Sequence, residues 1–126
     1  MHAAQHRYIK RTHFDVLVAI VLEKDGLAVV ARSGAVQDVV WSTAVQHGPY
    51  AAVVHLALTA VREQGLTPDA AGFDRTLIQA IYAERRRRSA DGQLVYFAKN
   101  SSAVQAGVAA RFIAEERDAL RMLDGR

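Results

Sequence analysis

Residues 14–45 contain three apolar, β-branched stretches separated by two short turn-forming segments, and this pattern constrains the fold more than any other feature. The expected strands are Phe14–Leu22, Leu27–Arg32 and Val36–Val45. The first connection ends in Asp25-Gly26, a pair that tolerates the positive φ of a tight hairpin, and Ser33-Gly34 supplies the second turn. The third stretch alternates between apolar and mixed side chains with a period of two. We therefore expect a three-stranded antiparallel meander.

The remainder of the chain predicts helices and one further strand. Pro49–Gln64 is apolar on nearly every side and is followed by Gly65, so we expect a buried helix on the meander, covered elsewhere by the C-terminal helix or by another subunit. Residues 74–85 fit a helix or a strand, and the charged continuation through Arg88 favours the helix because it exceeds the usual strand length. Gln93–Lys99 combines β-branched and aromatic residues between turn signals, which is typical of a strand.

The best-marked helix is the last one. Ser102 and Gln105 have the spacing of a capping box, and the helix is expected to end at Gly125. Its apolar stripe consists of Val104, Val108, Phe112, Ala119, Met122 and Leu123. The fold class expected from these elements is α+β: a meander, a buried helix, a further strand and a C-terminal helix.

Length and composition predict one folded domain over residues 1–126, with a loosely ordered N-terminal segment at residues 1–13. The chain is 51% apolar and 23% charged, which is typical of a globular protein. It contains no cysteine, which excludes disulfides and thiolate chemistry. No apolar run reaches the roughly 18 to 20 residues of a membrane span, so we expect a cytoplasmic protein with no membrane contact.

This order of elements resembles that of the ribonuclease-H-like fold. The resemblance implies metal-binding carboxylates on the first strand, at the start of the first helix and at the end of the fourth strand. Asp15 and Asp74 match two of these positions, whereas Pro49–Val61 contains no acid. The carboxylate set is therefore incomplete, and a degenerate nuclease is a remote alternative.

Basic residues dominate the candidate binding surface. The net charge is +3, and four adjacent arginines form an unbroken run at residues 85–88. Arginine forks bind phosphate and carboxylate oxygens, although basic residues at a helix end also serve the helix dipole. The expected contacts with nucleic acid or an acidic protein surface are Arg85, Arg86, Arg87 and Arg88, joined by Arg7, Lys10, Arg11 and Lys99. The primary hypothesis is a non-catalytic nucleic-acid-associated protein.

The alternative hypothesis is a protein-interaction or assembly module, such as an oligomeric accessory factor or small inhibitor, that uses its apolar helix. Under either hypothesis we expect a homo-oligomer, most simply a dimer. Glycine-rich phosphate loops and nucleophile elbows are absent from the sequence, so we assign no catalytic residue and expect no cofactor. His2, His6 and His13 have no carboxylate at matching spacing, and we assign no metal site to them.

Overall fold

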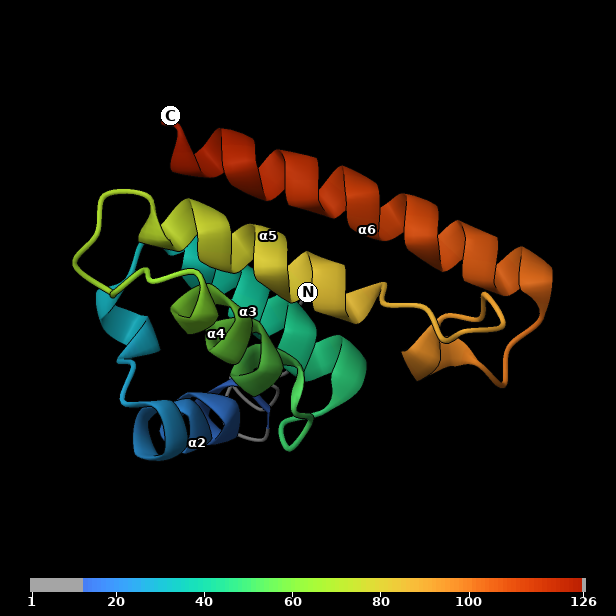
Figure 1. The fold of residues 1–126 in the computed structure, drawn as a ribbon, viewed down its shortest axis with the longest axis horizontal. Helices are drawn as coiled ribbons and strands as arrows, with labels where there is room; N and C mark the ends of the chain where they lie inside the picture. The colour runs from blue at the N-terminus through green and yellow to red at the C-terminus, as the bar shows by residue number, and fades with distance from the viewer. Residues whose placement is uncertain (1–12, 126) are drawn as a thin grey trace, which may run out of the picture.

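The computed structural model describes residues 13–125, and this part of the chain consists of five α-helices with two short 3-10 turns (Figure 1). The helices are α2 (Asp15–Asp25), α3 (Gly34–His47), α4 (Val53–Glu63), α5 (Phe73–Arg85) and α6 (Ser102–Leu123), and the turns are η2 (Val29–Ala31) and η3 (Val95–Phe97). Within these residues the only β-type contact is an isolated antiparallel bridge between Arg88 and Leu94. The predicted α+β class with a three-stranded meander is therefore wrong.

The first expected strand is the helix α2, because its apolar residues recur at helical spacing. Phe14, Leu17 and Val21 are separated by three and four residues, and all three are buried. Gly26, which was expected in a hairpin turn, instead ends the helix. It has a φ of 70°, and its N–H donates to the carbonyl of Leu22. A positive φ at glycine serves a helix C-cap as well as a hairpin, so this signal did not distinguish the two.

The second expected strand, Leu27–Arg32, is a short connection that contains η2, and the third is most of α3. Ser33 does not turn a hairpin: its hydroxyl accepts a hydrogen bond from the N–H of Val36 and caps α3. The buried residues of α3 are Ala35, Val36, Val39, Val40, Thr43 and Ala44. This spacing of three and four residues outweighs the alternation that had indicated a strand.

The resemblance to the ribonuclease-H-like fold fails with the meander, because that fold requires a sheet. The two acids that matched its carboxylate positions also have other roles. Asp15 lies in the first turn of α2. Asp74 lies in the first turn of α5, where its carboxylate accepts hydrogen bonds from Arg32 and from the backbone N–H of Ser33.

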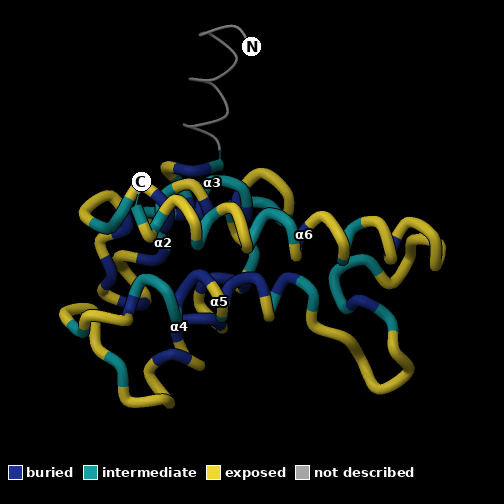
Figure 2. The backbone as a smooth tube through the Cα atoms, turned by 90° about the horizontal axis from the view of Figure 1, so that it is seen from above, coloured by how far each residue is buried: buried dark blue, intermediate teal, exposed yellow. Residues whose placement is uncertain are grey.

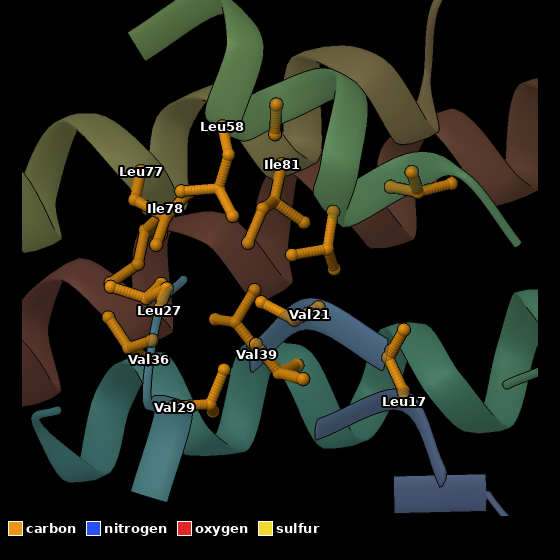
Figure 3. Close-up of a cluster of buried hydrophobic side chains, with 14 of the residues drawn as sticks. Leu17, Val21, Leu27, Val29, Val36, Val39, Leu58, Leu77, Ile78 and Ile81 are labelled. Carbon is orange, nitrogen blue, oxygen red and sulfur yellow. The ribbon is translucent and has the colours of Figure 1, made fainter. Parts of the chain in front are cut away.

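A single apolar core lies between α4, α5, α3 and α2. Figure 3 shows side chains from these helices pointing toward one another, with Leu58 of α4 and Ile81 of α5 above Val21 of α2 and Val39 of α3. Figure 2 shows the same region as the most deeply buried part of the backbone. The apolar sides of α4 are thus covered by α5, α2 and α3, so neither a sheet nor another subunit is needed to bury them.

The C-terminal helix packs on α5 and α3 rather than on α4. It runs antiparallel to α5, and its N-terminal end extends beyond the end of α5 (Figure 1). Residues 86–101 connect the two helices there. The expected strand Gln93–Lys99 lies in this connection and contains η3.

Ser101, one residue before the expected cap, closes the start of α6 by accepting from the N–H of Val104. Gln105 does not complete a capping box. Its side chain is buried, accepts from the N–H of Leu94 and donates to the carbonyl of Asn100. None of the helices between residues 13 and 125 combines the length and apolarity needed to cross a membrane.

Candidate functional site

The largest fully buried side chain in the described part of the chain is that of an arginine, Arg85, in the last turn of α5. Its guanidinium carbon lies 4.2 Å from the ring centre of Phe112 on α6 and 4.9 Å from that of Tyr82. These are cation–π distances, and the two rings shield the charge from water on two sides. The first arginine of the run is therefore part of the interior.

Three polar side chains surround the guanidinium. Arg85 donates from Nε to His47 Nε2 at 3.1 Å and from Nη1 to Ser42 Oγ at 3.2 Å. Nη1 also lies 3.9 Å from Glu115 Oε1, while Nη2 is buried without a hydrogen-bond partner. The same Glu115 oxygen accepts from the hydroxyls of Ser42 at 3.3 Å and Tyr82 at 3.1 Å. We call Ser42, His47, Tyr82, Arg85 and Glu115 the Arg85 cluster.

Burial determines the protonation of this cluster. Desolvation, followed by the charges of Arg85 and Arg111, lowers the pKa of His47 to about 4, so its imidazole is neutral near pH 7. A neutral imidazole has one unprotonated nitrogen, so Nε2 of His47 can accept the hydrogen bond from Arg85. Desolvation also raises the pKa of Tyr82 to about 12, which keeps its hydroxyl protonated and able to donate to Glu115. The cluster therefore holds one buried cation beside one carboxylate.

A cavity of about 300 Å³ opens beside the Arg85 cluster, between α3, α5 and α6. Its lining combines hydroxyl, carboxylate and apolar groups: Asp38, Val39, Ser42, Tyr82, Glu115, Asp118, Ala119 and Met122. An apolar hollow with a few converging polar groups is the usual form of a ligand site, and this volume is at the small end of the range. The cavity and the Arg85 cluster together form the candidate site.

The other three arginines of the run have separate partners. Arg86 forms an ion pair with Glu116 at 2.7 Å, and Arg87 pairs with Glu84 at 3.0 Å one turn away. Arg88 is exposed and donates to the carbonyl of Gly92. The four guanidinium groups thus point to different neighbours, and only Arg86, Arg87 and Arg88 retain exposed surface. Their binding to an acidic protein surface stays a prediction.

The remaining predicted contacts are dispersed. Lys99 is exposed in the connection between η3 and α6. Arg7, Lys10 and Arg11 lie outside the described residues, as do His2 and His6. In the part of the chain that is described, no three histidine, aspartate or glutamate side chains gather as a metal-binding group.

A second polar group connects α2 to α4. Asp25 ends α2 with its carboxylate almost fully buried, and its Oδ1 lies 2.7 Å from Nδ1 of His55 and 3.6 Å from Nη1 of Arg62. His55 is half-exposed and has this carboxylate as its partner. None of these three residues lines the cavity. We assign them a role in holding α2 on α4.

Sequence reasoning missed Ser42, His47, Tyr82 and Glu115 as members of the site. One signal was present: in a helix over residues 74–85, Arg85 follows Leu77 and Ile81 at intervals of four, on the apolar face. Arg85 was therefore distinguishable from the rest of the run. Nothing in the sequence paired it with Ser42 and Glu115, which lie on helices 43 and 30 residues away in the chain.

The fold and site define a small helical bundle with an internal polar cluster, a class that is compatible with many functions. Comparison with known families narrows this range of functions. Residues 1–116 match the family described as "Type VI secretion system spike protein VgrG3-like, C-terminal", and the chain belongs to this family. It is 36% identical over 63 residues to the type VI secretion system spike protein VgrG3 of Vibrio cholerae. That similarity covers 50% of this chain and only 6% of the curated relative.

This membership overturns the primary hypothesis from the sequence. A nucleic-acid-associated protein and a ribonuclease-H-like nuclease are both wrong, because the family is that of a secretion spike and residues 13–125 form no sheet. The alternative, a protein-interaction or assembly module, agrees better with the family.

Proposed function

We propose that this chain is a protein-interaction module that works as part of a type VI secretion spike. The observation that carries the proposal is the match of residues 1–116 to the C-terminal region of VgrG3-like spike proteins. Several large apolar side chains of the described residues are exposed, including Tyr50 at 80% and Val30 at 62%, and they are available for contact with a partner.

The test of this function is export. An antibody against the chain should detect it in the culture medium of its bacterium, and the signal should disappear in a strain whose type VI secretion system is disabled. A cytoplasmic marker protein controls for lysis. Equal amounts of the chain in both media, or its absence from both, would contradict the proposal.

We further propose that the module self-associates within such an assembly, which retains the homo-oligomer expected from the sequence. The original reason, an uncovered α4, no longer applies, because α5, α2 and α3 bury the apolar face of that helix, and among its large apolar side chains only Leu56 is exposed, at 39%. Light scattering at micromolar concentration should give a multiple of 13.8 kDa. A mass of one chain across the accessible concentration range would refute self-association while leaving the export result unaffected.

A further inference from the structure

We propose that His47 is an acid-sensitive switch: when its imidazole takes up a proton, the ring leaves Arg85 and the turn η3 separates from the end of α3. The inference concerns a local conformational change in the connection between α5 and α6, and it does not depend on the secretion function. It rests on the contact of His47 with Arg85, on the burial of Arg85, and on the contacts of the His47 ring with η3.

The hydrogen bond between His47 and Arg85 requires a neutral imidazole. Nε of Arg85 donates to Nε2 of His47 at 3.1 Å. A guanidinium has donors only and stays charged, so Nε2 must supply the lone pair. A protonated imidazole carries a donor on each nitrogen. Protonation of His47 would therefore set two donors and two positive charges against each other at this distance.

Of these two side chains, His47 is the one that can move. The Arg85 side chain is fully buried, is enclosed by the rings of Tyr82 and Phe112, and donates to Ser42. Displacing its guanidinium would break all of these contacts. His47 is the last residue of α3 and is only partly buried. A change of its side-chain rotamer takes the imidazolium toward water, where the charge is solvated.

The charged and titratable groups around His47 hold the switch closed at neutral pH. Burial of the ring, followed by the charges of Arg85 on α5 and Arg111 on α6, lowers the pKa of His47 to about 4, while Glu84 on α5 acts in the opposite direction. Burial raises the pKa of Tyr96 in η3, so its hydroxyl stays neutral in acid. The closed arrangement is thus fully favoured above pH 6.5 and is lost as the pH falls toward 4.

The ring of His47 joins η3 to the end of α3. Its centre lies 5.2 Å from that of Tyr96 and 5.7 Å from that of Phe97, and both contacts are edge-on. When the imidazolium turns toward water, these two rings lose a packing partner. Leu94, directly before η3, remains held by its hydrogen bond to Gln105 of α6. The opening is therefore confined to η3, whose aromatic rings become accessible.

Nuclear magnetic resonance of the full chain tests the switch. Near pH 7 we expect nuclear Overhauser effects from the ring of His47 to the rings of Tyr96 and Phe97. At about pH 3.5, where most of the His47 rings are protonated, these effects should disappear. The effect between Tyr82 and Phe112, whose ring centres lie 6.2 Å apart, should remain. Loss of all the effects together would mean that acid unfolds the whole bundle, and retention of all would mean that η3 does not open; either result would overturn the proposal.

The variant His47→Gln retains an acceptor for Arg85 but does not titrate. In the parent, the ring-proton shifts of Tyr96 and Phe97 should follow one titration with the midpoint of His47 itself, at about pH 4. In His47→Gln these shifts should stay constant over the same range. His55→Gln is the matched control, because it removes a half-exposed histidine of α4 and should leave the titration unchanged. Shifts that still titrate in His47→Gln would contradict the proposal.

Two nearby carboxylates also take up protons in acid, and their glutamine variants separate them from His47. Glu84 accepts from the hydroxyl of Tyr96, and Glu115 lies 3.9 Å from Arg85. Both Glu84→Gln and Glu115→Gln should retain the titration of the η3 rings. Glu84→Gln should move its midpoint to lower pH, because Glu84 favours the imidazolium. A titration that disappears in either variant while the His47 ring still titrates would assign the opening to that carboxylate and overturn the proposal.

Discussion

The four adjacent arginines show how little a run of identical residues says about shared function. Only Arg85 belongs to α5, which ends there, and the backbone of Arg86, Arg87 and Arg88 is no longer helical, so the four neighbours in sequence face different surroundings. Arg85 points into the bundle, Arg86 toward α6, Arg87 back along α5, and Arg88 toward the turn at Gly92. A variant that changes all four to glutamine would therefore alter the buried Arg85 and disturb folding as well as binding. A test of the exposed surface should alter only Arg86, Arg87 and Arg88.

We predict that Arg85→Ala lowers the free energy of unfolding by about 3 to 5 kcal/mol, since it removes one partner of a buried charged pair. It also removes the hydrogen bonds to Ser42 and His47 and the cation beside Glu115, and it opens space between Tyr82 and Phe112. Chemical denaturation measures the loss. Arg88→Ala is the matched control and should change stability by no more than about 0.5 kcal/mol, because Arg88 is exposed. Similar losses in both variants would show that Arg85 is not in the core.

His47 should make the protein sensitive to mild acid. Its pKa is lowered from 6.5 to about 4 in the folded state, so between these values the unfolded chain takes up a proton that the folded chain refuses. Its contribution to stability is complete above pH 6.5 and is lost as the pH falls toward 4. The shift corresponds to at most about 3 kcal/mol, and the partial exposure of the ring reduces the expected value to about 1 to 2 kcal/mol.

The measurement is the free energy of unfolding as a function of pH in the parent and in His47→Gln. The glutamine can still accept from Arg85 but does not titrate, so its stability should fall less between pH 6.5 and 4. Parallel curves for the two proteins would mean that His47 titrates normally in the folded state.

At the scale of the elements, three helices were located but not their starts. The segments 49–64 and 102–125 contain α4 and α6, and residues 74–85 cover all of α5 except Phe73. The predicted start at Pro49 is four residues before that of α4, and the cap of α6 is Ser101 and not Ser102. Phe14–Leu22 and Val36–Val45 contain so many β-branched residues that two periodicities fitted them equally, and tertiary packing selected the helical one. The turn residues between them, Gly26 and Ser33, are the same in both interpretations.

The start of α6 provides a direct test at this scale. Ser101→Ala should lower stability by about 1 kcal/mol, because its hydroxyl accepts the N–H of Val104. Ser102→Ala, which the sequence alone would favour as the damaging change, should cost less than about 0.5 kcal/mol, since Ser102 already lies inside the helix and is exposed. Thermal denaturation of the two variants gives the comparison. A larger loss of stability for Ser102→Ala than for Ser101→Ala would show that Ser102, and not Ser101, caps α6.

For the whole molecule, the described core forms one continuous cluster to which α2, α3, α4, α5 and α6 all contribute. We therefore predict that the chain unfolds in one cooperative transition, as a single domain should. Trp41, whose ring centre lies 5.5 Å from that of Phe14, reports on the packing of the N-terminal helices, and far-ultraviolet circular dichroism reports on all helices. The two curves should coincide in urea. A separate, earlier fluorescence transition would mean that α2 detaches as its own unit.

The candidate site also emerges only at this scale. Composition and local pattern located Arg85 but not its surroundings, because Ser42, Glu115 and the cavity walls come together through the packing of α3 and α6 on α5. The positions of these side chains relative to Arg85 depend on which faces of α3, α5 and α6 pack together. The local pattern of a single sequence does not determine that packing. For the same reason, the sequence did not identify the acids that line the cavity, Asp38, Glu115 and Asp118, as members of a site.

The hydrogen bond from Leu94 to Gln105 has a consequence for solvent exchange. Leu94 lies in the irregular connection between α5 and α6, yet it is fully buried and its N–H is held by a side-chain amide oxygen of the helix. Its deuterium uptake should therefore be slow, with rapid uptake at the exposed positions 89–92 only a few residues away. Gln105→Leu removes the acceptor and should raise the Leu94 rate toward that of its neighbours, while amides in the middle of α5 keep theirs. Uptake at Leu94 as fast as at positions 89–92 in the parent protein would mean that the connection is not anchored to α6 in solution.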